Sequence, residues 1–204
     1  MRVIMSVWRK YWETWKNIMF NPQTAFSKLN NFRDTNIFYL QSMGITYILT
    51  VILLLLLFGG ILIIFSILGS SGIEGIPDDQ FPLMLLGGLA GGIILFPFAL
   101  LLYWGSLYVW AGIVHLFVLM FGGKGYRETV TAIGYSSAGQ PLTVIPILNY
   151  VAMFYMIFLQ IMGIKARHKL TTGKAVAIVL IPTFFFMMIF GIVYIILLSL
   201  SDVF

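Results

Sequence analysis

Long uncharged stretches alternate with short charged segments along this chain. Apart from His115, the stretches 35–73, 80–123, 129–164 and 175–201 contain no charged residue and no histidine. Each is longer than the roughly 18 residues that a helix needs to cross about 30 Å of hydrocarbon. Helices are expected because backbone polar groups find no water in a bilayer core. The pattern therefore predicts an all-α polytopic membrane protein.

The basic residues are confined to three segments. All 12 Lys and Arg residues lie within 2–33, 124–127 and 165–174. The acidic loop around Glu74, Asp78 and Asp79 lies between the first two segments and holds no base. Because positively charged loops stay on the cytoplasmic side of a membrane, the basic segments are expected inside and the acidic loop outside.

This charge pattern also predicts how often each stretch crosses. Stretch 80–123 joins an acidic loop to a basic one, so it crosses an odd number of times, and its length admits one crossing with a kink at Pro97. Stretch 129–164 has bases at both ends, so it crosses as a hairpin bent at Gly139, Pro141 and Pro146. Five transmembrane helices follow, with the N-terminus cytoplasmic and the C-terminus outside. Their approximate bounds are 37–68, 83–121, 128–145, 147–165 and 173–200.

The first arm of that hairpin, 128–145, is short and rich in hydroxyl groups. It is expected to be either a short buried span or a re-entrant segment, which needs protein or water around it.

Residues 1–35 are predicted to form an amphipathic cytoplasmic helical arm before the membrane domain, 36–204. A first helix has Trp8, Trp12 and Trp15 on one face at helical spacing, with Arg9 and Lys16 beside them. A second helix is expected to begin at Asn21-Pro22. The Trp face suits a helix lying in the interface, because Trp favours the headgroup level and bases favour anionic lipid. Alternatively, it packs on the protein's own cytoplasmic surface.

The composition supports membrane insertion and limits the chemistry. Hydrophobic residues make up 60% and charged residues 9%, whereas soluble domains contain about a quarter charged residues. The sequence has no Cys, which excludes disulfides, thiol catalysis and Cys-ligated metals. It offers no nucleophile–base pair, paired carboxylates or His cluster, so neither an enzyme nor a metal or other cofactor is expected.

Uncharged polar residues near the hairpin and the second span are candidates for a pocket that holds a lipid headgroup or a small solute. The alternative is that they form hydrogen bonds between helices, and His115 is expected to have a structural role. The candidate pocket residues are Tyr103, His115, Tyr135, Ser136, Ser137 and Gln140.

Four glycines in the second span, Gly87, Gly88, Gly91 and Gly92, form overlaid small-xxx-small pairs. Such pairs let helix backbones approach closely. They predict helix packing, either within the chain or in a homo-oligomer.

A lipid- or partner-binding surface is expected on the cytoplasmic face, where the amphipathic arm meets the third basic segment. Its candidate residues are Trp8, Trp12, Trp15, Arg9, Lys16, Lys165, Arg167 and Lys169. The expected partners are membrane lipids and a cytoplasmic protein, and no nucleic acid.

Three groups of residues resemble the Yip domain family, and in particular its prokaryotic-type members. One is Asn21-Pro22 with Phe26 and Leu29. Another is Gly122-Gly123, followed by Gly134-Tyr135-Ser136 and Pro141. The last is Gly163 to His168, leading to Leu170 to Ala175.

The resemblance implies a five-helix membrane protein without assigned catalysis, associated with membrane organisation or partner binding, here in the cell membrane of a prokaryote. Eukaryotic members interact with Rab-type GTPases and carry an Asp-Leu-Tyr-Gly-Pro stretch before the first span. This sequence offers only Asp34 and Tyr39 there, so GTPase recognition is not carried over.

Two functions are consistent with these patterns. The first is a non-enzymatic integral membrane protein whose cytoplasmic face binds lipid headgroups or a partner protein. The alternative is a small transporter or channel that uses the polar pocket around the 129–164 hairpin and the second span. The absence of carboxylates deep in any span argues against ion-coupled transport.

Overall fold

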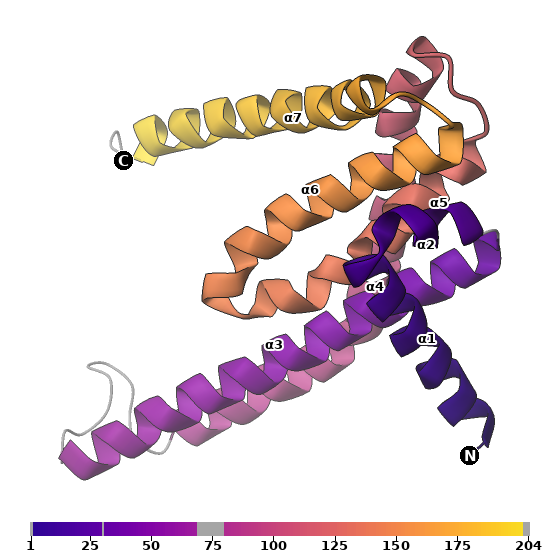
Figure 1. The fold of residues 1–204 in the computed structure, drawn as a ribbon. Helices are drawn as coiled ribbons and strands as arrows, with labels where there is room; N and C mark the ends of the chain where they lie inside the picture. The colour runs from indigo at the N-terminus through magenta and orange to yellow at the C-terminus, as the bar shows by residue number, and fades with distance from the viewer. Residues whose placement is uncertain (1, 30, 69–79, 202–204) are drawn as a thin grey trace.

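The computed structural model of the chain describes residues 2–29, 31–68 and 80–201, and this part is helical throughout (Figure 1). The all-α prediction is confirmed there, while the acidic loop around Glu74, Asp78 and Asp79 lies outside the described residues. The elements are α1 (Arg2–Phe20), α2 (Pro22–Lys28), α3 (Phe32–Leu68), α4 (Gln80–Met120), α5 (Tyr126–Ser136), the 3₁₀ helix η1 (Ser137–Val144), α6 (Pro146–His168) and α7 (Thr172–Ser201).

Four helices in the described ranges are long and apolar enough to cross a membrane: Phe32–Gly60, Leu86–Met120, Pro146–His168 and Thr172–Ser199. They correspond to the first, second, fourth and fifth predicted spans. Large apolar side chains on α3, α4, α6 and α7 face outward. Lipid tails are as apolar as these side chains and can solvate them, so the protein is an integral membrane protein.

The predicted span 128–145 is not a continuous α-helix. Its α-helical part, α5, has 11 residues, and the chain continues as the eight-residue 3₁₀ helix η1. Pro141 lies inside η1. It lacks an N–H group and its ring clashes with the carbonyl four residues earlier, so it opposes an α-helix here. Both α5 and η1 pack against α6, and together the three elements form a hairpin.

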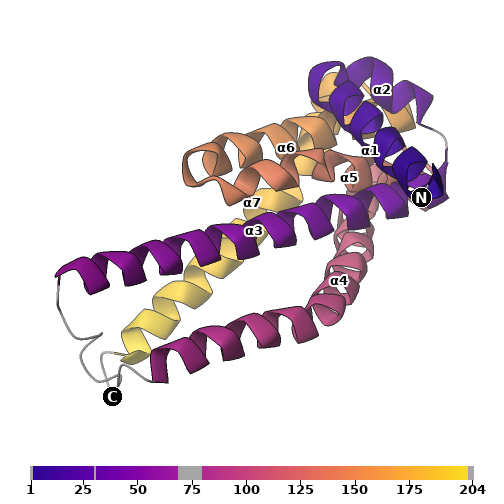
Figure 2. The ribbon, with the colours of Figure 1, turned by 90° about the horizontal axis from the view of Figure 1, so that it is seen from below.

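One end of the molecule is densely packed and the other is open to its surroundings. A first apolar cluster joins the helices α3, α4, α5, α6 and α7 through residues such as Met43, Ala111 and Ile178. A second cluster packs α1 and α2 against α3, η1 and α6. Beyond these clusters α3 and α4 diverge, and α4 bends along its length (Figure 2). Its internal proline is Pro97, and sharp helix kinks usually occur at proline.

The three basic segments meet at the packed end. Lys10 Nζ lies 2.7 Å from Asp34 Oδ2, at the start of α3. The Arg167 guanidinium contacts both the Leu29 carbonyl and the Glu128 carboxylate. Lys174 Nζ lies 3.4 Å from the Phe121 carbonyl. We call this end the basic end.

Close approach of elements depends on particular glycines. A Cβ atom on Gly163 would lie 3.0 Å from Ala132 Cβ and 3.0 Å from Phe26 Cε1, so only glycine lets α6 contact α5 and α2 in this way.

Of the predicted glycine pairs, Gly92 lies against α3, and its carbonyl accepts a 2.5 Å hydrogen bond from the Tyr47 hydroxyl. A Cβ atom on Gly87, Gly88 or Gly91 would have no neighbour within 4 Å among the described residues.

We predict that Gly163→Ala lowers the free energy of unfolding in detergent by about 1–3 kcal/mol, because the added methyl overpacks the junction of three helices. Gly191→Ala on α7 is the matched control, since its Cβ would have no described neighbour within 4 Å. Equal loss in the two variants would show that the effect is not one of packing.

Candidate functional site

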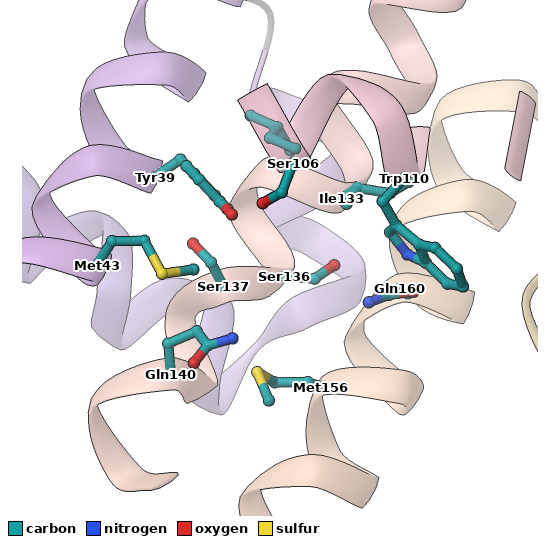
Figure 3. A pocket seen from close by; sticks show the side chains of 11 residues that line it. Tyr39, Met43, Ser106, Trp110, Ile133, Ser136, Ser137, Gln140, Met156 and Gln160 are labelled. Atoms are coloured by element: carbon teal, nitrogen blue, oxygen red, sulfur yellow. The ribbon is translucent and has the colours of Figure 1, made fainter. Parts of the chain in front are cut away.

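A partly open cavity of about 190 Å³ lies between α3, α4, α5, η1 and α6. Figure 3 shows side chains from all five elements pointing toward this common space. The lining residues are Tyr39, Met43, Ser106, Leu107, Trp110, Ile133, Ser136, Ser137, Gln140, Met156 and Gln160.

The polar groups of the cavity wall are uncharged, and its serines donate to backbone carbonyls close by in the chain. Ser136 Oγ donates to the Ala132 carbonyl at 2.7 Å, and Ser137 Oγ donates to the Gly134 carbonyl at 2.7 Å. Ser106 Oγ donates to the Tyr103 carbonyl at 2.7 Å. The hydroxyl protons are thereby used, and the oxygen lone pairs of Ser136 and Ser137 stay available to the cavity, whereas Ser106 also pairs with the Tyr39 hydroxyl.

The structure brings together only part of the predicted polar pocket. Ser136, Ser137 and Gln140 line the cavity, whereas Tyr103, Tyr135 and His115 do not. Tyr103 lies on the outer surface of α4 and is 46% exposed. Tyr135 is buried with its ring centroid 5.0 Å from that of Phe38. Of the six residues predicted to form one pocket, three therefore line this cavity and three lie elsewhere.

Sequence reasoning missed two polar side chains on opposite walls, Tyr39 on α3 and Gln160 on α6. Tyr39 lies near the start of one long uncharged stretch and Gln160 lies within another. A polar residue within a membrane span is itself a signal of an inward-facing position. That signal was present at Gln160 but carried no information on which helices face it.

His115 belongs to a second polar cluster, formed with Thr129 and His168. The distance from His115 Nδ1 to Thr129 Oγ1 is 2.8 Å, and the distance from Thr129 Oγ1 to His168 Nε2 is 3.1 Å. Three helices, α4, α5 and α6, are linked by this one hydroxyl group. The structural role predicted for His115 fits these contacts. Among the described residues, no group of three His, Cys, Asp or Glu is placed to hold a metal ion.

Arg167 is engaged inside the protein rather than on its surface. Its side chain is 10% exposed. Its Nε atom donates to Glu128 Oε2 at 2.5 Å, and its Nη1 atom donates to the Leu29 carbonyl. Lys169, by contrast, is exposed and ends α6 in the left-handed region with φ 52°. Of the bases predicted for the cytoplasmic surface, Arg9, Lys16 and Lys169 are exposed, Lys165 is half-buried and Arg167 is held inside.

One face of α1 packs on the protein. Tyr11 and Ile18 are buried, and the Trp15 indole Nε1 donates to the Ala138 carbonyl of η1 at 2.7 Å. The Tyr11 hydroxyl also pairs with the Ser42 hydroxyl of α3 at 3.2 Å. The Trp face predicted from sequence is thus divided, since Trp15 contacts the protein while Trp8 and Trp12 stay 41% and 47% exposed.

We predict that Thr129→Val lowers the free energy of unfolding by about 1–3 kcal/mol, because it leaves one nitrogen on each of two imidazoles without its partner. The same substitution at Thr183 is the control, since that hydroxyl donates only to the Val179 carbonyl of its own helix. Thermal unfolding in detergent measures both variants. A loss at Thr129 no larger than that at Thr183 would contradict a linking role for the hydroxyl.

Comparison with known protein families gives one match, to the Yip1 domain, over residues 16–195. Neither the search of curated proteins nor the search of solved structures finds a match. The matched range includes three of the four membrane-length helices in full, most of the fourth and the cavity, but only residues 16–20 of α1. It confirms the family resemblance on which the sequence motifs agreed. Because the match covers most of the chain, the protein belongs to the Yip1 domain family.

Proposed function

We propose that this protein is a non-enzymatic membrane-organising protein that binds anionic lipid headgroups on the cytoplasmic side through the outer face of α1. The observation that carries the proposal is an exposed stripe on α1 that combines apolar, aromatic and basic side chains. It consists of Met5, Trp8, Arg9, Trp12, Lys16 and Phe20, and we call it the α1 stripe.

Helix geometry places these residues together. Met5, Trp8, Trp12, Lys16 and Phe20 follow one another at intervals of three or four positions, and Arg9 lies four positions after Met5 and three before Trp12, so all six lie on one side of an α-helix. All six are exposed, with Met5 at 63% and Phe20 at 75%. Large exposed apolar side chains beside bases are typical of helices that lie in a membrane interface. The neighbouring face of α1 is anchored through Tyr11, Trp15 and Ile18, and the stripe beside it stays exposed.

The orientation of α1 supports the same proposal. In Figures 1 and 2, α1 runs across the beginning of α3 rather than along it. If α3 crosses the membrane, a helix that runs across it lies close to the membrane plane. The salt bridge between Lys10 and Asp34 fixes this crossing at the basic end.

We further propose five crossings, with α5 and η1 together forming the third. At 1.5 Å per α-helical residue, α5 extends about 16 Å. At 2.0 Å per 3₁₀ residue, η1 adds about 16 Å, so the pair reaches across about 30 Å of hydrocarbon if it runs in line. Without this crossing, Lys165, Lys169 and Lys174 would lie on the opposite side from Lys124, against the positive-inside rule.

In this topology the N-terminus and the basic end are cytoplasmic and the C-terminus is outside, in the cell membrane of a prokaryote. The contact of Arg167 with Glu128 supports it, because that contact joins the second and third basic segments. The alternative of a transporter or channel stays a prediction that rests on the cavity alone.

The lipid proposal predicts that neutralising the α1 stripe removes its preference for anionic lipid. Each base near an anionic surface contributes about 1 kcal/mol, so Arg9→Gln with Lys16→Gln should weaken the association of α1 by about 2 kcal/mol. The measurement is quenching of tryptophan fluorescence by headgroup-proximal brominated lipid, in nanodiscs with and without anionic lipid.

Replacing Trp8 and Trp12 with Phe should reduce the same quenching, because these are the exposed indoles of α1. Lys28→Gln on α2 is the control for the Arg9 and Lys16 substitutions, since Lys28 is exposed but lies outside the stripe. Quenching that is independent of anionic lipid in the wild type would overturn the lipid proposal. The stripe would then be the surface to test against a cytoplasmic protein partner.

The topology predicts which positions an impermeant reagent can reach. The sequence contains no Cys, so single cysteines can be introduced without background. In intact cells, a maleimide that cannot cross the membrane should label Ile145→Cys and Ser201→Cys but not Lys124→Cys. Ile145 is 49% exposed at the turn of the hairpin. Protection of Ile145→Cys, together with labelling after the cells are opened, would contradict the third crossing.

A further inference from the structure

We infer that the cavity between α3, α4, α5, η1 and α6 binds an uncharged, hydroxyl-bearing group about the size of glycerol. The group comes either from a free polyol or from the head of a neutral acylglycerol. The inference rests on three properties of the cavity: unused hydrogen-bonding capacity, the absence of charge in its wall, and its volume. It is independent of the function proposed for α1.

The unused capacity lies on Gln140 and Gln160. A glutamine amide has two N–H donors and an oxygen that can accept two hydrogen bonds. Both side chains line the cavity, from η1 and α6, and within the described ranges neither forms a hydrogen bond to the chain. Both residues are partly exposed, so their amides stay accessible from the partly open cavity. A ligand in the cavity can therefore pair with both amides.

The remaining polar groups favour a ligand that donates hydrogen bonds. The hydroxyl protons of Ser106, Ser136 and Ser137 are donated to backbone carbonyls three or four residues earlier in the chain. Ser136 and Ser137 consequently present only oxygen lone pairs to the cavity, whereas Ser106 also pairs with the hydroxyl of Tyr39 in the same wall. A hydroxyl group of a ligand can donate to such oxygens and still accept from the glutamine amides, whereas an ester or ether oxygen can only accept.

The wall excludes charged ligands. None of the lining residues is Lys, Arg, His, Asp or Glu. A phosphate would meet serine oxygens without a cation to balance its charge, and an ammonium group would find no carboxylate. Transfer of an unpaired ion into such an environment is far more costly than transfer of a hydroxyl group.

The volume sets the size of the ligand. At roughly 30 Å³ for each water-sized group, a cavity of about 190 Å³ holds about six non-hydrogen atoms, the number in glycerol. Met43 and Met156 lie in the wall with Trp110 (Figure 3). Methionine adapts its shape to irregular apolar groups, so these residues suit the carbon atoms of a polyol or the start of an acyl chain.

The test is direct binding to the full chain, purified in detergent, with glycerol and an oleoyl monoacylglycerol as probes. Glycerol phosphate and choline are the charged comparisons. Isothermal titration and the shift in melting temperature measure the binding. We expect the monoacylglycerol to bind and the two charged compounds not to bind. Binding of glycerol as well identifies a free polyol as sufficient, and binding of the monoacylglycerol alone identifies the lipid as the source.

Gln160→Leu and Ser137→Ala should each weaken the binding of the monoacylglycerol at least tenfold, which corresponds to 1.4 kcal/mol or more. Gln23→Leu is the matched control because Gln23 is exposed on α2, away from the cavity. The melting temperature of ligand-free Gln160→Leu should not fall, since leucine removes an unpaired amide. That measurement separates lost binding from lost folding.

Three results would overturn the inference. One is equal binding by the wild type and Gln160→Leu in protein that remains folded. Another is binding of glycerol phosphate or choline as tightly as the monoacylglycerol. The third is no binding of either neutral probe, which would make the cavity a hydrated space only. None of these results bears on the lipid contact proposed for α1, whose test uses different variants and a different readout.

Discussion

The arrangement at the basic end depends on the guanidinium group of Arg167. It joins the carbonyl that ends α2, the carboxylate of Glu128 on α5 and its own helix α6. Only arginine presents several N–H groups in a planar fork that can serve a carboxylate and a carbonyl together. A mostly buried cation would be costly without these partners. The ion pair therefore holds three segments that are distant in sequence and closes the α5–η1–α6 hairpin at its open end.

The molecule consequently has two parts with different sources of stability. At the basic end, buried side chains and internal hydrogen bonds hold α1, α2 and α5 against the longer helices. Beyond it, α3, α4 and α7 expose apolar side chains over most of their surface, and lipid takes the place of protein contacts. Both candidate sites, the α1 stripe and the cavity, belong to the packed part, where internal contacts hold the helices that carry them.

The sequence was informative where a property extends over many residues and uninformative where a contact joins a few distant ones. The four long uncharged stretches predict five spans, of which four are membrane-length helices among the described residues, and helical spacing predicts α1. The same stretches are apolar on all sides, so no periodicity indicates that Gln160 and Tyr39 line one cavity. In the sequence, Arg167 is one of the loop bases that indicate the cytoplasmic side. Its contact inside the protein depends on the position of the Leu29 carbonyl, at the end of α2. The division of 128–145 into two helix types arises because Pro141 opposes an α-helix locally.

The Thr129 hydroxyl group carries a single proton between two imidazoles, and this has a consequence for the direction of the hydrogen bonds. If the hydroxyl donates to His115, it accepts from His168, and if it donates to His168, it accepts from His115. When the hydroxyl donates to one ring, the two rings therefore carry complementary protonation at the nitrogens that face it. The proton position on His168, at the end of α6, is then coupled to that on His115 in α4.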